Sequence, residues 1–389
     1  MDVKNKGLYT LALQKGAGKG NGCGIIGAQN FLHLPIKEQP PRFVEQTKQG
    51  QPNTGVCAVD QMHQNPHDRL ARLLASDMEQ VDQVIRARMA SENAPRIPEV
   101  TAHLVGAGGK RLRPLLTLAA ARLCGYQGPF HVHLAATVEF IHTATLLHDD
   151  VVDESEQRRG RPTANLLWDN KSSVLVGDYL FARSFQLMVE TGSLRVLDIL
   201  ANASATIAEG EVLQLTAARN LATDESVYLK VVRGKTAALF AAATEVGGVI
   251  ANASPAVVAA LAAYGDALGV SFQIADDLLD YEGNATQTGK NVGDDFREGK
   301  LTLPLIKAIA QADASERAFW QRVIESGDQK PGDLEQALEI LARHGALQAT
   351  RADALHWAGV ARSALDALPD TDLRALLGEL SDYVVARLV

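Results

Sequence analysis

The sequence predicts an all-α protein, built as a bundle of ten or more helices. Almost every segment after residue 66 spaces its apolar residues at i, i+3 and i+4, the period of a helix with one buried face. No convincing alternation of apolar and polar residues, the pattern of a half-buried strand, is present. Aromatic residues make up only 5% of the chain, so Ala, Leu and Val must fill the interior, which suits closely packed helices.

The expected helices follow one another with short breaks between them. Breaks rich in Gly, Pro or Asn fall at 106–109, 125–129, 252–255 and 283–299, because these residues favour turns over helices. The clearest expected helices are 70–89, 114–123, 132–153, 174–190, 195–213, 225–249, 255–281 and 303–312. No regular repeat is visible, which argues against a solenoid.

Residues 1–65 differ from the rest in composition, and we expect a flexible extension before an all-α domain at 66–389. They contain nine Gly and four Pro. Within them Gly22, Gly24 and Gly27 match the pattern GxGxxG. A dinucleotide site needs a strand before that turn and a helix after it, which the Gly-rich and Pro-rich surroundings do not offer. We therefore interpret the match as part of the extension.

Charge and composition exclude several classes of protein. The net charge of −8 disfavours a nucleic-acid partner, because such proteins carry a basic footprint. Glu245 and Asp266 interrupt the longest apolar stretches, so we expect no membrane span of about 20 residues. The three cysteines, Cys23, Cys57 and Cys124, form no CxxC pair, which fits a reducing compartment. A soluble cytoplasmic protein is expected.

The most specific feature is a DDxxD motif that occurs twice. The copies contain Asp149, Asp150 and Asp153, and Asp276, Asp277 and Asp280. On a helix the first and last Asp of each copy lie one turn apart and about 40° apart on one face. Like charges in this arrangement repel, so each pair calls for a positive partner. Carboxylate oxygens suit Mg²⁺, and both motifs end apolar helices, which favours metal binding over two solvated acidic faces.

Basic residues surround both motifs and predict a site for phosphate groups. Lys110 and Arg113 follow a glycine-rich turn, with Pro114 expected at the first position of the next helix. His142 lies seven residues before Asp149 and about 20° off its face, so we expect it deeper in the same groove, although a buried core histidine is the alternative. The segments after the two motifs add Arg158, Arg159, Lys290 and Lys300.

Two aspartate pairs with metal between them and cations around them would bind diphosphate esters. No Ser-His-Asp set, no cysteine nucleophile with an evident base and no P-loop is apparent. Metal ions and cations neutralise the charge that develops as a C–O bond breaks, so they turn a diphosphate into a leaving group. An allylic substrate would leave a carbocation, which survives only where water is excluded.

Five segments resemble the signatures of the trans-polyprenyl diphosphate synthases, in the same order and at the same spacing. They are GGKRLRP, LLHDDVVDESEQRRGRPTAN, GKT, FQIADDLLDY and GKNVGDDFREGKLTLPLI. The resemblance covers about residues 68–389 and implies an all-α bundle of mostly antiparallel helices around a central cavity, usually in a homodimer. It also implies a Mg²⁺-dependent prenyltransferase, with several ions per site and Mn²⁺ as a substitute. The implied reaction is repeated condensation of isopentenyl diphosphate onto an allylic diphosphate.

The resemblance also implies a role for each candidate residue. The metal ligands would be Asp149, Asp153 and Asp276, helped by Asp280, with Asp150 supporting the first motif. The allylic diphosphate would contact Arg158, Lys235, Lys290 and Lys300. The isopentenyl diphosphate would contact Lys110, Arg113, His142 and Arg159. Thr236 and Gln273 would stabilise the allylic cation, and Gly234 would permit a helix kink that aims Lys235 and Thr236 inward.

Small side chains before the first motif predict a long product. The growing prenyl chain is expected to pass the helix that carries this motif. Ala144 and Thr145 would form the floor of the cavity there, and Ile141 lies one turn further. Short-chain members of the family have bulky aromatic residues at the floor. We therefore expect an octaprenyl to decaprenyl product, of the kind used as a quinone side chain, which partitions into the membrane.

The sequence leaves alternative functions open. A shorter-chain synthase, making geranylgeranyl or farnesyl diphosphate, would differ mainly in the size of the side chains at the cavity floor. A terpene cyclase would share the fold and the ionisation chemistry, but it rarely has two DDxxD motifs and has no use for a second diphosphate pocket. A di-iron bundle would need a second ExxH pair besides Glu139 and His142. A non-enzymatic helical interaction protein is the binding-class alternative.

Overall fold

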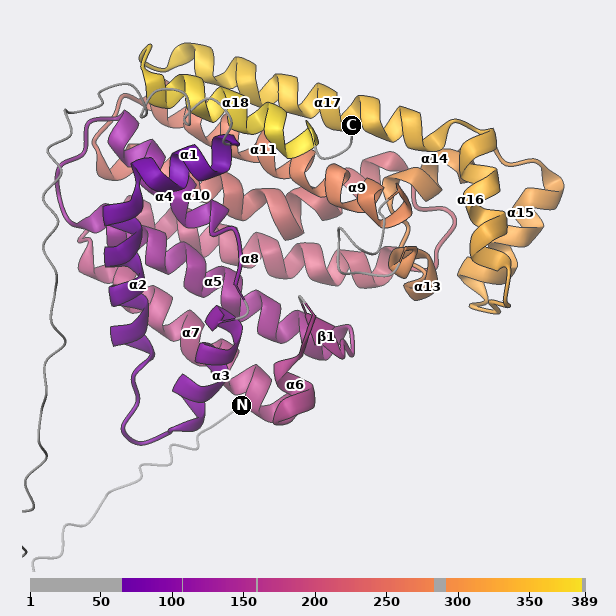
Figure 1. The fold of residues 1–389 in the computed structure, drawn as a ribbon, viewed down its shortest axis with the longest axis horizontal. Coiled ribbons are helices and arrows are strands. Elements are labelled where there is room, and N and C mark those ends of the chain that lie inside the picture. Colours follow the sequence, from indigo (N-terminus) through magenta and orange to yellow (C-terminus); the bar gives the residue numbers. More distant parts are fainter. Residues whose placement is uncertain (1–64, 107, 159, 283–291, 387–389) are drawn as a thin grey trace, which may run out of the picture. The chain divides into compact units, whose positions relative to one another are not determined.

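The computed structural model describes residues 65–106, 108–158, 160–282 and 292–386, and in these residues nearly every element is a helix (Figure 1). The elements are α1 (Pro66–Leu73), α2 (Ala75–Met89), α3 (Arg96–Gly106), α4 (Leu112–Leu123), α5 (Phe130–Val152), β1 (Gln157–Arg158), β2 (Arg161–Pro162), α6 (Ala164–Leu167), α7 (Asn170–Glu190), α8 (Leu194–Ala217), α9 (Glu225–Val232), η2 (Arg233–Ala237), α10 (Ala238–Ile250), α11 (Pro255–Glu282), α13 (Asp294–Glu298), α14 (Leu303–Gln311), α15 (Ala314–Trp320), η3 (Gln321–Glu325), α16 (Asp333–Arg343), α17 (Ala346–Ala364), η4 (Leu365–Ala367) and α18 (Asp372–Ala386). The all-α prediction is confirmed. The GxGxxG match, Arg159 and Lys290 lie outside the described residues.

The long helices pack in successive layers that place α5 and α11 around a shared interior. Helix α11 packs against α10 on one side and α17 on the other, while α5 packs against α7. Figure 1 shows α17 and α18 covering α11, with α10, α8 and α5 below it and α7 beyond them. The two helices that carry the DDxxD motifs therefore belong to neighbouring layers of the bundle.

Helix α11, with 28 residues, is the longest helix of the described part of the chain and contributes many side chains to the core. Among the described residues it alone has the length and hydropathy that a membrane-crossing helix needs, despite Asp266. Its side chains Leu261, Tyr264 and Leu268 are fully buried and belong to the main hydrophobic cluster. Core helices of soluble proteins pass the same test of length and composition, and the packing of α11 against α10 and α17 identifies it as one of them.

Glycine lets α11 approach α10 at the level of the backbone. A Cβ atom on Gly265 would collide with the Phe240 carbonyl oxygen and come within 2.6 Å of the Ala241 Cα. One turn further, a Cβ on Gly269 would lie 2.6 Å from the Ala237 Cα. Any larger side chain would force these helices apart and displace the second aspartate motif.

The structure differs from the sequence-based expectation at four places. The helix expected at 70–89 is two helices, because Leu74 leaves the helical region with φ −106° and ψ 14°. The continuous helix that periodicity predicts at 225–249 is interrupted by the π-helical turn η2, at Gly234, where only the family resemblance implied a kink. Helix α4 begins at Leu112, so Pro114 is its third residue, a first-turn position whose missing N–H costs nothing. Strands β1 and β2 form a two-residue antiparallel pair, too short to give an alternating pattern.

Replacing Gly265 tests the close approach of α10 and α11. We expect Gly265→Ala to lower the free energy of unfolding by about 1–3 kcal/mol, because the new methyl group overpacks the interface. Urea unfolding followed by circular dichroism measures the change. The matched control is Gly359→Ala in α17, where an added Cβ meets nothing within 4 Å and helix propensity favours Ala by about 1 kcal/mol. Equal stability of the two variants would contradict the packing argument.

Candidate active site

A cavity of about 1020 Å³ lies between the helices that carry the two aspartate motifs. The candidate residues that line it are Lys110, Arg113, His142, Asp149, Asp153, Arg158, Lys235, Thr236, Gln273, Asp276, Asp280 and Lys300. They come from the start of α4, from α5, β1, η2 and α11, and from the segment after α13. Residues separated by almost 200 positions in the chain therefore share one cavity.

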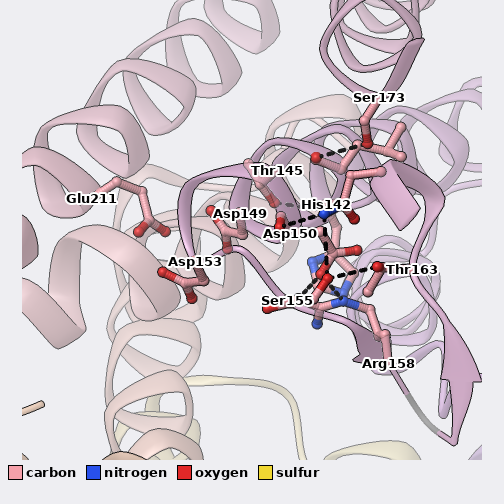
Figure 2. Close-up of polar contacts among 12 residues, drawn as sticks. His142, Thr145, Asp149, Asp150, Asp153, Ser155, Arg158, Thr163, Ser173 and Glu211 are labelled. Atoms are coloured by element: carbon pink, nitrogen blue, oxygen red, sulfur yellow. Dashed lines mark hydrogen bonds and ion pairs between the residues drawn. The ribbon is translucent and has the colours of Figure 1, made fainter. Parts of the chain in front are cut away.

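The three aspartates of the first motif divide between the cavity and the protein interior. Asp149 and Asp153 line the cavity, as their helical spacing predicts, whereas Asp150 is fully buried. The Arg158 side chain donates to Asp150 Oδ1 through Nε at 2.8 Å and approaches it through Nη2 at 2.7 Å (Figure 2). Asp150 therefore anchors Arg158, whose side chain also lines the cavity.

Two lysines lie against the carboxylates of the first motif. Lys300 Nζ is 3.2 Å from Asp153 Oδ2 and 2.6 Å from a Glu298 carboxylate oxygen. Lys235 Nζ is 3.7 Å from Asp149 Oδ2. Burial raises the pKa of Asp149 above its ordinary value, and the opposing attraction of Lys235 does not fully offset that effect. The first motif therefore still favours additional positive charge.

Glu211 on α8 is a carboxylate of this site that the sequence analysis missed. Its Oε2 accepts a hydrogen bond of 2.8 Å from Lys235 Nζ, and Figure 2 shows its side chain directed toward Asp149 and Asp153. Burial raises the pKa of Glu211 as well. The sequence carries no local signal for it, because Glu209 and Glu211 match no metal-binding or substrate-binding motif.

The second motif also divides its aspartates among different tasks. Asp276 lines the cavity, and so does Asp280. Both Asp280 carboxylate oxygens accept backbone N–H groups at the start of α13, from Asp294 at 3.2 Å and from Asp295 at 3.1 Å. Asp280 therefore caps α13 while facing the cavity, a role that the sequence analysis did not foresee.

Asp277 also lines the cavity but is almost fully buried, and it contacts Tyr228 and Gln273. Tyr228 Oη donates to Asp277 Oδ2 at 2.6 Å, and Gln273 Nε2 donates to Asp277 Oδ1 at 2.7 Å. Burial raises the pKa of Asp277 to about 7, although both hydrogen bonds act in the opposite direction. The sequence analysis assigned no role to Asp277 or Tyr228.

A basic pocket occupies another part of the cavity lining. The Arg113 guanidinium stacks over the Phe240 ring at 4.4 Å, and its Nη1 lies 3.4 Å from His142 Nε2. Burial lowers the pKa of Arg113 to about 10, so the side chain stays charged at neutral pH. Lys110 Nζ lies 5.7 Å from the centre of the Tyr383 ring. His142 thus lies beside Arg113 at the cavity, as its position relative to Asp149 predicts.

The turn η2 gives the helix irregularity expected at Gly234. A Cβ on Gly234 would lie 2.8 Å from the Gly210 Cα in α8, so the two backbones touch. The π-helical turn Arg233–Ala237 contains Lys235 and Thr236, and both line the cavity. The tight contact between α8 and η2 therefore brings Glu211 next to Lys235.

Only one of the three positions expected to control chain length lies at the cavity surface. Thr145 lines the cavity, whereas Ala144 and Ile141 are fully buried in the surrounding core. The described residues that close the cavity nearby include Phe240 and Phe272, whose rings are 5.6 Å apart. Both aromatic residues were missed by the sequence analysis, because they lie on α10 and α11 and not on the helix of the first motif.

The donor set of the cavity fits a hard divalent cation. Its carboxylate oxygens come from both DDxxD motifs, and oxygen ligands of this type suit Mg²⁺. The described residues contain no group of three or more His, Cys, Asp or Glu close enough to hold an ion by themselves. An ion here would complete its coordination with water and substrate oxygens, the usual arrangement for Mg²⁺.

Comparison with known proteins identifies relatives across most of the chain. Residues 94–341 match the polyprenyl synthetase family. The chain is 44% identical to the octaprenyl diphosphate synthase of Escherichia coli (strain K12), over 82% of this chain and 98% of that protein. It is 42% identical to an all-trans-nonaprenyl-diphosphate synthase (geranyl-diphosphate specific) of Rhodobacter capsulatus, over 81% of this chain and 96% of that protein.

Crystal structures of similar proteins share the fold. A decaprenyl diphosphate synthase from Rhodobacter capsulatus is 72% identical with a TM-score of 0.81, over 83% of this chain and 100% of that one. A polyprenyl synthase from Caulobacter crescentus CB15, described as a complex with calcium and isoprenyl diphosphate, is 52% identical with a TM-score of 0.80, over 83% and 98%. These matches show that the chain belongs to the long-chain trans-polyprenyl diphosphate synthases of the polyprenyl synthetase family and is a prenyltransferase.

Proposed function

We propose that the protein is a Mg²⁺-dependent synthase that repeatedly condenses isopentenyl diphosphate onto an allylic diphosphate. The observation that carries this proposal is a single cavity lined both by aspartates of the two DDxxD motifs and by the basic residues Lys110 and Arg113. A terpene cyclase would need only one diphosphate site. The Caulobacter relative, described with calcium and isoprenyl diphosphate, supports the same assignment.

We assign metal binding to Asp149, Asp153 and Asp276, with Asp280 as an additional oxygen donor. When bound, Mg²⁺ would neutralise the allylic diphosphate and assist its departure. Arg158, held by Asp150, and the two lysines Lys235 and Lys300 would contact the same diphosphate. Arg159 and Lys290, outside the described residues, stay predicted substrate ligands.

The basic pocket would hold the second substrate. Lys110, Arg113 and His142 together present two cations and an imidazole, which suits a diphosphate bound without metal. The double bond of isopentenyl diphosphate would then attack C1 of the allylic cation through C4, forming the new C–C bond. The resulting cation would lose a proton from C2 to the departed diphosphate, which restores an allylic diphosphate one unit longer.

Stabilisation of the intermediate cation falls to neutral oxygens. Thr236 Oγ1 and Gln273 Oε1 lie 2.8 Å apart and their side chains line the cavity. Oxygen lone pairs directed at a developing positive charge stabilise it without reacting with it. The apolar helices around the cavity would exclude the water that would otherwise capture the cation.

The product is proposed to be an all-trans octaprenyl to decaprenyl diphosphate that supplies a quinone side chain. The relatives described as octaprenyl, nonaprenyl and decaprenyl synthases support this range. Thr145 adds little bulk to the cavity wall beside the first motif, and Ala144, buried next to it in the chain, is small as well. A shorter-chain function has no comparable support in the residues of this wall.

The active form is proposed to be a cytoplasmic homodimer. Helices α7 and α8 expose several large apolar side chains, which a monomer in water would not favour. They include Leu175, Val189, Leu194, Val212 and Leu215. A monomer in sedimentation velocity at micromolar concentration would contradict this assembly.

Loss of one carboxylate of the first motif tests the proposed chemistry. We expect Asp149→Asn to lower kcat by about 100-fold or more. The variant loses a carboxylate ligand of the Mg²⁺ that would neutralise the departing diphosphate. Incorporation of labelled isopentenyl diphosphate into organic-soluble product, with farnesyl diphosphate as primer, measures the rate with Mg²⁺ and with EDTA.

The matched control is Asp370→Asn, because this side chain is 88% exposed and lies outside the cavity lining. It should keep full activity. The proposed function is wrong if the unmodified protein forms no product, or if EDTA leaves its rate unchanged.

Replacing small residues beside the first motif with phenylalanine tests the proposed product length. We expect Thr145→Phe and Ala144→Phe to shorten the product by several isoprene units, because the aromatic ring meets the growing chain. Thr145 lines the cavity, so its variant needs no rearrangement of the core, whereas the fully buried Ala144 does. Reversed-phase chromatography of the dephosphorylated products measures their length.

The control for bulk alone is Leu355→Phe on the exposed side of α17, which should leave the product unchanged. If both phenylalanine variants make products as long as those of the unmodified protein, the growing prenyl chain does not pass Thr145 or Ala144.

A further inference from the structure

A series of three hydrogen bonds runs along the wall of the cavity from α9 to η2. Tyr228 Oη donates to Asp277 at 2.6 Å, Gln273 Nε2 donates to Asp277 at 2.7 Å, and Thr236 Oγ1 donates to Gln273 Oε1 at 2.8 Å. Tyr228, Asp277 and Thr236 are each at most 6% exposed. Bonds this short among buried groups restrict the orientation of every member.

The chemistry of a carboxylate gives this series a direction. An ionised carboxylate only accepts hydrogen bonds, so both Tyr228 and Gln273 must donate to Asp277. The amide of Gln273 therefore directs its NH₂ group toward Asp277 and its carbonyl oxygen toward Thr236. The reversed amide would bring Oε1 within 2.7 Å of a carboxylate oxygen, where two acceptors repel.

The same direction determines what the cavity meets. The hydroxyl hydrogen of Thr236 is committed to Gln273 Oε1, so the remaining lone pairs of both oxygens are free of donated protons. Oxygen lone pairs of Thr236 and Gln273 are thus available to a positive centre in the cavity. Without Asp277, no other hydrogen bond of this series prevents the Gln273 amide from turning its NH₂ group toward the cavity.

We propose that Asp277 and Tyr228 are positioning residues that orient the Gln273 amide, so that oxygen lone pairs of Gln273 and Thr236 face the allylic cation. This inference rests on the proposed function, because it concerns the intermediate of that reaction. It separates Asp277 from Asp276 and Asp280, its neighbours in the second motif. Asp277 acts through hydrogen bonds, and its charge is not required as a metal ligand.

The experiment compares binding of a cationic and a neutral analogue of the allylic substrate. The cationic probe is an aza analogue of farnesyl diphosphate with a protonated nitrogen in place of the cationic carbon. The neutral probe is the unreactive thiolodiphosphate analogue, which resembles the ground state. An environment complementary to the cation affects only the first probe and kcat, whereas a substrate ligand affects both probes and KM. Isothermal titration calorimetry in the presence of Mg²⁺ measures the affinity of each variant for both probes.

The variants are Tyr228→Phe, Asp277→Leu and Asp277→Asn, with Tyr281→Phe as the matched control. Tyr281 is equally buried on α11, but its hydroxyl faces Thr302 and is not part of the series. We expect Asp277→Leu and Tyr228→Phe to weaken the cationic probe and lower kcat on the order of 10-fold, with the neutral probe and KM within about 2-fold. Asp277→Asn should recover most of the loss, because its amide oxygen still accepts from Gln273 and its NH₂ group donates to Tyr228.

The proposal is wrong if Asp277→Asn is as damaging as Asp277→Leu and raises the Mg²⁺ concentration required, since that identifies Asp277 as a metal ligand. It is also wrong if every variant weakens both probes equally, or if Tyr281→Phe matches Tyr228→Phe. Should the Asp277 variants fail to fold, Tyr228→Phe against its control still decides the question. An unmodified protein that forms no prenyl product refutes the proposed function, while an active one with unselective variants refutes only this inference.

Discussion

Repulsion among partly buried carboxylates is the constraint on which the arrangement of this cavity depends. Asp149, Asp153 and Glu211 converge from α5 and α8 on one cavity, where partial burial weakens the screening of like charges by water. Lys235 and Lys300 supply the compensation available within the chain. The raised pKa values of Asp149 and Glu211 show that this compensation is incomplete. An acidic protein thereby prepares a site for diphosphates, because the missing charge is left for cations to provide.

Holding these charges together requires a rigid frame, and small residues provide it. Gly210 meets Gly234 where α8 crosses η2, and Gly265 meets α10 along α11. Each contact fixes a backbone that carries a charged or polar side chain of the cavity. These side chains are Glu211 and Lys235 at the first contact and Gln273 about two turns beyond the second. The low aromatic content of the chain is consistent with this role, since large rings at the crossings would separate the helices. The aromatic residues Phe240 and Phe272 are instead found at the cavity lining.

The sequence predicts those features that depend on local periodicity. The all-α fold, the shared face of Asp149 and Asp153, and the position of His142 follow from the geometry of one helix, and the structure agrees with each. Tertiary contacts escape this reasoning. Glu211 gains its importance from a lysine 24 residues away, and Tyr228 from an aspartate on another helix. Ala144 shows the same limit, since its helical position suggested a cavity floor although its side chain is enclosed by the core.

The two DDxxD motifs share a sequence pattern, but their aspartates make different contacts. One of these contacts connects the second motif to the first. The middle aspartate of the first motif holds Arg158, whereas that of the second holds Tyr228 and Gln273. The last aspartate of the first motif faces Lys300, whereas Asp280 caps the start of α13. Lys300 follows the end of α13, and its backbone N–H donates to the Asp295 carbonyl oxygen within that turn. Asp280 therefore stabilises the short helix that presents Lys300 to Asp153, so the second motif contributes to the charge balance of the first. A repeated sequence pattern here encodes two complementary halves of one electrostatic site, and an exchange of the motifs would not preserve it.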